Sequence, residues 1–331
     1  MGTGPFAVPS SERLLREGYE IALVVVRPSA AAVGKKSLVT PVQNWAAEAG
    51  LAIYAPASIN TPESLERLRD AQADLFFVCD YGQILSDACL GTARLGGINL
   101  HGSLLPRHRG AAPVQWTLLQ GDSLAGVSVI HMTPGLDAGP VLTTRSVSVL
   151  AGENAEELES RLSTLGCEAM IEAVQLLGQW DGASLIGQVQ DTSLATKAPR
   201  LQKSHGRLDF SLPAIELERR VRGYQPWPGA YAELVYSETK RLVIHVRAAE
   251  AVAASGQDSP RAIGGAWLTL PQELGLPAAK QPVMAVQTGD GWLAIHSVQP
   301  AGKRVMSSGE FLRGHPLPSG AHFAQALRSG G

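Results

Sequence analysis

The first half of the chain alternates short apolar runs with amphipathic stretches of helical length, and this alternation constrains the fold more than any other feature. The runs at 21–26 (IALVVV) and 75–79 (LFFVC) are continuously apolar, which indicates strands buried on both faces. Shorter runs of this kind lie at 97–100 and 126–132, and helical patterns lie at 9–18, 40–50, 61–73, 114–121 and 154–178. The third helical pattern opens with Thr61 as an N-cap and Pro62 at its first position. Strands that alternate with helices predict an open parallel α/β sheet.

The pattern changes in the second half of the chain. A helical pattern at 212–223 precedes short, often alternating apolar segments separated by Gly, Pro, Ser and Asp, which predict a small antiparallel β-barrel. These segments lie at 231–235, 241–247, 266–270, 283–288 and 291–298. We therefore expect a catalytic domain at 1–183, a linker at 184–206 and a barrel domain at 207–331.

Length and composition fit this division. A chain of 331 residues favours two domains, and 45% hydrophobic residues are enough for a sizeable core in each. No apolar run is long enough to span a membrane, and the first residues lack the pattern of a secretory signal. Cys79, Cys89 and Cys167 have no metal-site spacing and are expected to be reduced thiols. Together these features predict a cytoplasmic protein without a bound metal.

The net charge of −2 conceals a difference between the two halves. Residues 1–190 carry 19 acidic against 12 basic side chains, whereas residues 191–331 carry 11 acidic against 16 basic. An excess of basic residues in the second half permits contact with a nucleic acid. A solvated surface would account for the same balance.

Candidate chemistry is concentrated at 97–113, GINLHGSLLPRHRGAAP. Asn99 and His101 have the same parity on one predicted strand, so both side chains leave one face near its carboxyl end, where α/β sheets bind ligands. Asp137 lies in a Gly-flanked loop after a later strand and is a candidate partner for the imidazole. An amide, an imidazole and a carboxylate would suit acyl transfer to an amine. Structural hydrogen bonding by each of the three residues is the alternative, and the residues by themselves leave both possibilities open.

Other motifs are weaker. The opening MGTGPF lacks the full dinucleotide-binding fingerprint, and no strand precedes it. Gly34-Lys35-Lys36 lacks the spacing of a phosphate-binding loop, and Lys303-Arg304 alone is typical of surface charge.

Several of these motifs together resemble one family from nearly end to end. NLHGSLLPRHRGAAPVQW, GLDAGPVL, MGTGPFAVP, the GKK loop, DYGQIL and the closing QPAGKRVMSSGEFLRG are similar to segments of the folate-dependent formyltransferases, specifically those that act on methionyl-tRNA. The resemblance implies a Rossmann-like catalytic domain followed by a barrel of the oligonucleotide-binding (OB) kind.

The resemblance also implies a reaction. A formyl group would pass from 10-formyltetrahydrofolate to the amino group of initiator methionyl-tRNA, with no metal. A monomer is our default expectation and does not come from the resemblance. By motif position, the catalytic residues would be Asn99, His101 and Asp137. The folate would contact Ser103, Leu104, Leu105, Pro106, Tyr81 and Gly82, and the tRNA would contact Lys35, Lys36, Lys303 and Arg304. A formyltransferase for a sugar-nucleotide or other small amine, and an inactive RNA-binding relative, remain the alternatives.

Two departures from the family pattern matter. The family has several residues before Met-Gly-Thr that form the first, central strand of the sheet, and this sequence starts at Met1. We expect a gap between two buried strands there, with unpaired backbone groups, and suspect a start codon upstream of Met1. Val33 stands where the family usually has an arginine, which puts the detail of tRNA recognition in question.

Overall fold

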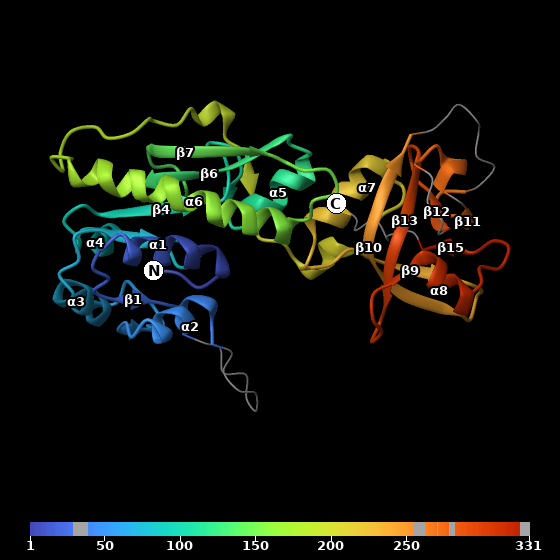
Figure 1. Cartoon of the computed structure of the whole chain (residues 1–331), viewed down its shortest axis with the longest axis horizontal. Helices are drawn as coiled ribbons and strands as arrows, with labels where there is room; N and C mark the ends of the chain where they lie inside the picture. Colours follow the sequence, from blue (N-terminus) through green and yellow to red (C-terminus); the bar gives the residue numbers. More distant parts are fainter. Residues whose placement is uncertain (29–38, 254–261, 270, 278–281, 325–331) are drawn as a thin grey trace. The chain divides into compact units, whose positions relative to one another are not determined.

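The computed structural model describes residues 1–28, 39–253, 262–269, 271–277 and 282–324, which form two compact units (Figure 1). The first unit comprises Met1–Val114, Ser123–Val149 and Glu157–Arg200. The second comprises Gln115–Asp122, Leu150–Glu156 and Leu201–Gly331. The chain passes from the first unit to the second for the last time between residues 200 and 201. This point lies inside the segment predicted as a linker, 184–206.

The first unit is built on short strands. One sheet has the order β3 (Phe76–Val78), β4 (Gly97–His101), β6 (Leu124–His131) and β7 (Val141–Ser148), and β1 (Val24–Val25) pairs separately with β2 (Ile53–Tyr54). The pairs β1–β2 and β3–β4 are parallel, as predicted. The prediction of a wholly parallel sheet is wrong at β6, which runs antiparallel to both β4 and β7. The connection from β6 to β7 is too short for the crossover that a parallel pair needs, so the two strands form a hairpin.

Among the described residues no strand lies between β1 and β3, which belong to separate sheets. Met1 and Gly2 lie between them, and Gly2 forms a single parallel bridge to Cys79. The fold is Rossmann-like, and Met1 and Gly2 form backbone hydrogen bonds with both neighbouring segments, to Val25 on one side and to Phe77 and Cys79 on the other.

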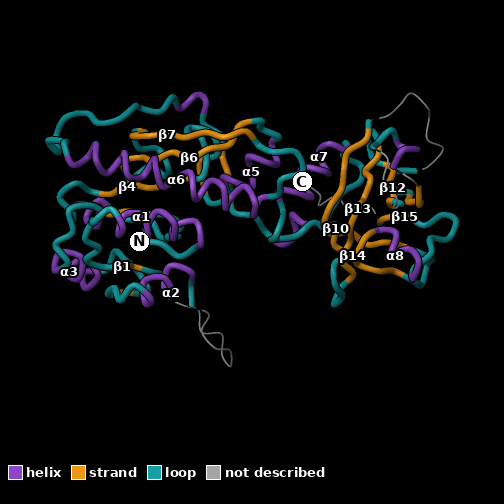
Figure 2. Tube along the Cα trace, in the orientation of Figure 1, coloured by secondary structure: helices purple, strands orange, loops and turns teal. Residues whose placement is uncertain are grey.

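Helices cover the strands of this part of the chain (Figure 2). They are α1 (Val8–Arg16), α2 (Pro41–Glu48), α3 (Pro62–Asp70), α4 (Asp87–Leu90) and α6 (Ala155–Gly178). Most of α5 (Pro113–Gln120) belongs to the second unit. The predicted cap of α3 is confirmed, because the Thr61 hydroxyl accepts a hydrogen bond from the Ser64 N–H at 3.2 Å and Pro62 is the first helical residue. Gly166 of α6 packs against Leu100 of β4, where a Cβ would come within 2.8 Å of the leucine. Within the described ranges, no helix is both long and apolar enough to cross a membrane.

The second unit contains the predicted antiparallel barrel. Its strands are β9 (Tyr231–Val235), β10 (Arg241–Val252), β11 (Ala266–Thr269), β12 (Val283–Gln287), β13 (Trp292–Pro300), β14 (Met306–Ser307) and β15 (His322–Phe323). The order β11-β12-β13-β10-β9-β15 is nearly closed on itself, because the Phe323 N–H donates to the Gly264 carbonyl at 2.8 Å. Helices α7 (Ala214–Gly223) and α8 (Ser308–Gly314) contribute Leu217 and Phe311 to the core that fills the barrel.

Candidate active site

The three residues singled out for catalysis lie together at the carboxyl end of β4. Asn99 and His101 leave the same face of this strand, and the loop between β6 and β7 brings Asp137 to them. The Asn99 amide donates to Asp137 Oδ1 at 3.3 Å, and His101 Nδ1 lies 3.8 Å from Asp137 Oδ2. The side chains of His101 and Asp137 are 5% and 9% exposed, so charges on them interact with little screening by water.

Asp137 is held in an uncommon conformation. Its φ of +49° lies in the left-handed region, which Asp and Asn tolerate better than most residues. The Gly110 N–H donates to Asp137 Oδ2 at 2.8 Å, which fixes the carboxylate toward the imidazole. The carboxylate therefore accepts hydrogen bonds on both oxygens from two different segments of the chain.

A backbone carbonyl orients the imidazole. His101 Nε2 lies 2.9 Å from the His108 carbonyl oxygen, and only an N–H can make that bond, so Nε2 carries a proton. In the neutral ring the remaining nitrogen, Nδ1, has a lone pair, and this is the nitrogen that faces Asp137. The arrangement suits an imidazole that accepts a proton on Nδ1 and is stabilised as a cation by the carboxylate.

Two residues that support the site were missed by the sequence analysis because both lie in the segment predicted as a linker. The buried Gln190 donates to the carbonyls of Asp137 and Gly139 at 2.8 and 2.7 Å and accepts from Arg109. The Thr196 hydroxyl accepts from the His108 N–H at 2.8 Å, next to the parallel pairing of β5 (Arg109–Gly110) with β8 (Lys197–Ala198). No sequence signal marks either residue, since both stand in polar, non-repetitive surroundings.

Hydrogen bonds to β6 fix the predicted folate loop, 103–106. The Ser128 hydroxyl of β6 donates to the Ser103 carbonyl at 2.8 Å and accepts from the Leu105 N–H at 3.0 Å. Ser103 and Leu105 are buried, whereas Leu104 and Pro106 are partly exposed. The loop thus presents apolar edges and backbone next to Asn99 and His101, from a position fixed by the neighbouring strand.

The Tyr81-Gly82 loop follows β3 at the same edge of the sheet. The ring of Tyr81 lies in the core with Val25 and Ile59, and burial raises the pKa of its hydroxyl to about 12. Any contact of this loop with a ligand must therefore come from its backbone or from Gly82, where φ is +74°.

Asp80 lies between β3 and this loop. Its carboxylate packs against Gly4, where a Cβ would come within 2.9 Å of Oδ2, so the second glycine of the MGTG opening makes room for it. The residue as a whole is exposed, but its carboxyl group is surrounded by protein atoms. The resulting loss of solvation raises the pKa of Asp80, and the nearby His101 offsets part of this rise. By extension of the β3–β4 register, Asp80 is the neighbour of His101 across the two strands.

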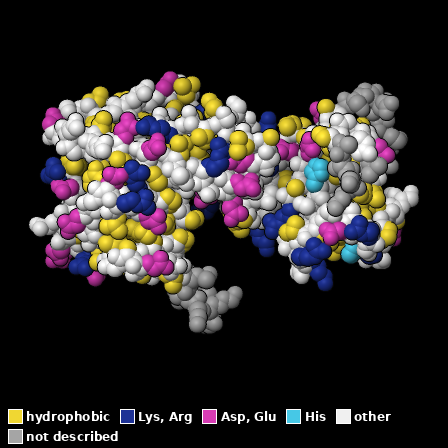
Figure 3. Space-filling view, viewed as in Figure 1, with side chains coloured by type: hydrophobic (Ala, Val, Ile, Leu, Met, Phe, Trp, Pro, Cys, Tyr) yellow, Lys and Arg dark blue, Asp and Glu magenta, His cyan; other side chains and the backbone are white. Residues whose placement is uncertain are grey.

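The candidate tRNA-contacting residues are divided between two places. Lys35 and Lys36, together with Val33, lie outside the described residues. Lys303 and Arg304 are exposed in the turn between β13 and β14 of the second unit, and Arg304 pairs with Glu310 at 3.3 Å. Lys and Arg side chains gather on the face of the second unit drawn in Figure 3.

In the described parts of the chain, no three His, Cys, Asp or Glu side chains are grouped closely enough to hold a metal ion. What the site does offer is an amide donor, a proton-accepting imidazole and a buried carboxylate, the set of groups that acyl transfer to an amine requires.

Comparison with known families agrees with this chemistry. Residues 1–174 match the formyl transferase family, and residues 200–316 match the C-terminal domain of formyl transferases. The chain belongs to the formyl transferase family, whose members are one-carbon group transferases.

The relatives narrow the assignment within this family. A protein from Rhodopirellula baltica is 44% identical over 97% of this chain and 94% of its own length. One from Methylococcus capsulatus is 38% identical over 96% of both. Both are named methionyl-tRNA formyltransferase, and the chain belongs with this branch of the family, as its motifs predicted.

A solved structure shares the fold at low identity. The N-formyltransferase from Helicobacter canadensis, crystallised with folinic acid and dTDP-3-aminofucose, superposes with a TM-score of 0.59 at 16% identity. The match covers 90% of this chain and 97% of that one. At 16% identity the match shows that the two proteins share a fold, and it does not indicate which amine this chain formylates.

Proposed function

We propose that this chain transfers a formyl group from 10-formyltetrahydrofolate to the amino group of initiator methionyl-tRNA, giving N-formylmethionyl-tRNA for translation initiation. The observation that carries the proposal is 44% identity, over nearly the whole of both chains, to a protein named methionyl-tRNA formyltransferase. We further propose that the enzyme acts in the cytoplasm as a monomer. The geometry around Asn99, His101 and Asp137 gives the reaction a chemical basis.

His101 is the proton acceptor in this mechanism. The amine of the aminoacyl group attacks the formyl carbon, a new N–C bond forms, and the bond from that carbon to the folate nitrogen breaks. His101 accepts the amine proton on Nδ1, because Nε2 is already bonded to the His108 carbonyl. Asp137, 3.8 Å from Nδ1, stabilises the imidazolium that results, and the same proton is then available to the departing folate nitrogen.

Asn99 acts on the formyl oxygen. Negative charge develops on this oxygen as the amine attacks, and a fixed donor stabilises it. The Asn99 side-chain NH2 has two N–H bonds, and its hydrogen bond to Asp137 uses only one of them. That hydrogen bond also holds the amide in place, so it needs no reorganisation during the reaction.

The donor set of the site fits a folate as co-substrate. Leu104 and Pro106 offer partly exposed apolar edges, and the loop that carries them is fixed to β6 through Ser128. Tyr81 and Gly82 would border the pterin through their backbone. These groups bind and orient the formyl donor, while Asn99 and His101 act on the reacting atoms.

The second unit would contact the tRNA backbone. We assign residues 207–331 to this contact, with Lys303 and Arg304 on the exposed surface of the barrel. Lys35 and Lys36 would contact the acceptor end. Contacts to phosphates give affinity that falls steeply with salt and carry little sequence information.

The test is formyl transfer measured with 10-formyltetrahydrofolate and charged initiator methionyl-tRNA. We expect turnover with this acceptor and none with a dTDP-linked amino sugar, and His101→Ala serves as the control without a proton acceptor. Turnover on the amino sugar alone would replace the proposed acceptor with a small amine. Binding of tRNA without turnover on either acceptor would indicate an inactive RNA-binding relative.

A further inference from the structure

Formyl transfer to a protonated amine releases two protons from the amine and returns only one of them. An α-amino group is mostly protonated at neutral pH, because its usual pKa is about 7.7–8.0. The ammonium form has no lone pair, so it loses one proton before it attacks and a second one after the N–C bond forms. The departing folate nitrogen takes up one proton by way of His101. The other proton must reach solvent, and this transfer needs an acceptor of its own.

The side chains already placed in the mechanism are poorly suited to release a proton to water. The Asp137 carboxylate accepts hydrogen bonds from the Asn99 amide at 3.3 Å and from the Gly110 N–H at 2.8 Å. Its side chain is only 9% exposed, and that of His101 is only 5% exposed. Both side chains are therefore enclosed, and a group nearer to solvent is needed.

Asp80 combines a position beside His101 with access to water. It follows β3 by two residues, and the register of β3 with β4 pairs Val78 with Asn99, so its continuation places Asp80 next to His101. The electrostatic effect of His101 on the Asp80 carboxyl group agrees with this position. Protein atoms surround the carboxyl group, yet the residue is exposed, so the carboxylate is enclosed by protein and still open to water.

The backbone fixes Asp80 in an uncommon conformation. Its φ of +50° lies in the left-handed region, as do the φ of +49° at Asp137 and of +61° at His108. Such conformations persist where the surroundings determine them, and they cluster at functional sites. All three residues lie around His101, so the Asp80 carboxylate is held as part of the same arrangement.

The Asp80 carboxylate lacks a partner of its own. In the part of the chain that the structure describes, no group donates a hydrogen bond to it, and no Lys or Arg forms an ion pair with it. A carboxylate that is largely removed from water and has no donor is costly. A ligand that brings N–H donors and a positive charge would satisfy it.

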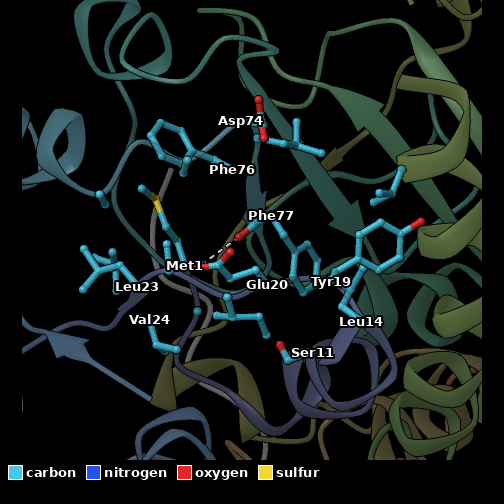
Figure 4. Close-up of a pocket in the computed structure, with 18 of the residues that line it drawn as sticks. Met1, Ser11, Leu14, Tyr19, Glu20, Leu23, Val24, Asp74, Phe76 and Phe77 are labelled. Atoms are coloured by element: carbon cyan, nitrogen blue, oxygen red, sulfur yellow. Dashed lines mark hydrogen bonds between the residues drawn. The ribbon is translucent and has the colours of Figure 1, made fainter. Parts of the chain in front are cut away.

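The charged and titratable groups nearby do not supply that partner. The Met1 amino group, on the segment that leads to Gly4, donates to the Phe77 carbonyl at 2.7 Å instead (Figure 4). The adjacent Cys79 is buried, and burial raises the pKa of its thiol, which is therefore neutral. Arg27, which follows β1, packs against Gly82. This leaves His101 of β4 as the titratable group that acts on Asp80.

We propose that the Asp80 carboxylate binds the α-ammonium group of the acceptor and accepts the first of its two protons. The proposal rests on the proposed function, which supplies the amine. One N–H bond of the ammonium group breaks, its proton goes to a carboxylate oxygen, and the nitrogen keeps the electron pair with which it attacks the formyl carbon. Water then takes this proton from Asp80, and His101 accepts the second one.

The environment of the carboxyl group favours this transfer. Loss of solvation raises the pKa of Asp80, which brings the basicity of the carboxylate closer to that of the amine. A smaller difference in pKa between donor and acceptor makes the proton transfer less unfavourable.

The experiment compares kcat/KM for methionyl-tRNA between the unsubstituted chain and Asp80→Asn from pH 6.5 to pH 8.5. Asparagine keeps the size of the side chain, tolerates the φ of +50° and removes the basic carboxylate. The matched control is Asp70→Asn. Asp70 is exposed at the end of α3, and α3 leads into the start of β3, so this residue lies at the opposite edge of the sheet from the site.

The effect of Asp80→Asn should depend on pH. At pH 6.5 only about 5% of the amine is unprotonated, so the variant should have a kcat/KM about tenfold or more below that of the unsubstituted chain. At pH 8.5 most of the amine arrives unprotonated, and the two values should agree within about threefold. Asp70→Asn should match the unsubstituted chain at both values of pH.

A second measurement tests the binding of the ammonium group without turnover. A tRNA charged with the α-hydroxy analogue of methionine carries a hydroxyl in place of the ammonium group. At pH 6.5 the unsubstituted chain should bind methionyl-tRNA about tenfold more tightly than this analogue, and Asp80→Asn should bind both equally. Equal binding of the two by the unsubstituted chain would overturn the proposal.

The pH profiles can also overturn it. A ratio of the two kcat/KM values that is the same at pH 6.5 and pH 8.5 would exclude Asp80 as the acceptor of the first proton. A higher activity of Asp80→Asn at pH 6.5 would exclude it as well. That result would mean that Asp80 acts only by raising the pKa of His101, because loss of its charge would then leave more imidazole unprotonated.

The unsubstituted chain separates this proposal from the proposed function. If it formylates another amine and not methionyl-tRNA, the proposed acceptor is wrong, and the same profiles with that amine decide the role of Asp80. If it formylates no amine, both proposals are overturned.

Discussion

Replacing Asp137 with asparagine tests the role of the carboxylate most directly. The substitution removes one negative charge and leaves the size of the side chain unchanged. Asparagine is also among the few residues that accept the φ of +49° found at this position, so the loop should keep its conformation. The side-chain oxygen of asparagine can still accept the hydrogen bond from the Gly110 N–H, which is 2.8 Å long in this structure.

The expected loss follows from the distance between the charges. Opposite unit charges 3.8 Å apart, the separation of His101 Nδ1 and Asp137 Oδ2, interact by about 4 kcal/mol at an effective dielectric constant of about 20. If the imidazole is a cation in the transition state and neutral before it, that energy is lost from the barrier alone. Because each 1.36 kcal/mol is tenfold in rate, kcat should fall about 10³-fold.

The assay is the initial rate of formyl transfer at saturating 10-formyltetrahydrofolate and methionyl-tRNA, repeated under single-turnover conditions. KM for each substrate should stay within about threefold of its original value, because ground-state binding does not involve the imidazolium. Urea unfolding of Asp137→Asn and Asp137→Ala provides the control for folding. The asparagine variant should lose about 1–3 kcal/mol, because its NH2 group cannot accept the hydrogen bond that Asn99 donates to the carboxylate. A kcat within about tenfold of the unsubstituted enzyme would refute the proposed stabilisation of the imidazolium.

Four further predictions concern single groups. Asn99→Ala should lower kcat about 10²–10³-fold by removing a donor to the formyl oxygen, and steady-state kinetics that show a change in KM alone would contradict this. Gln190→Ala should lower kcat about tenfold by loosening the backbone of the Asp137 loop, which is 53 residues away in sequence; unchanged kinetics would remove its supporting role. The free energy of unfolding should rise by about 2 kcal/mol from pH 6 to pH 8, because in this window the unfolded Met1 amine binds more protons than the folded amine, whose pKa is about 6. Urea titrations should show this slope for the free terminus and lose it on N-acetylation. Lys303→Ala should weaken tRNA binding and reduce the salt dependence by about one charge; an identical salt slope in filter binding would exclude a phosphate contact.

Much of the fold was predictable because the signals were local. Continuous apolar runs located β1, β3, β4 and β6, and the Thr61-Pro62 pair located the start of α3. The antiparallel direction of β6 was not predictable from its apolar run, because periodicity reports burial and says nothing about direction. The eight-residue strand β7 was missed for a related reason, since only its Thr143 is buried and the segment lacks a continuous apolar run.

The candidate site also has parts that the sequence predicted and parts that it did not. The parity of Asn99 and His101 on one strand indicated a shared face, and the Gly-flanked loop of Asp137 indicated a turn that could face them. The group that orients the imidazole is the carbonyl of His108, and a backbone group has no sequence signature. Its position depends on a φ of +61° at His108, which is maintained by a contact with Thr196 from a distant segment.

The path of residues 188–198 has a practical consequence for dividing this protein into working pieces. Gln188 pairs with Val141, Gln190 holds the Asp137 loop, and Lys197 pairs with Arg109, so this stretch is part of the framework of the active site. A fragment that ends at residue 183 would lack all three contacts. A fragment that ends after Arg200 would keep them, and a chimera that exchanges the barrel should be joined there.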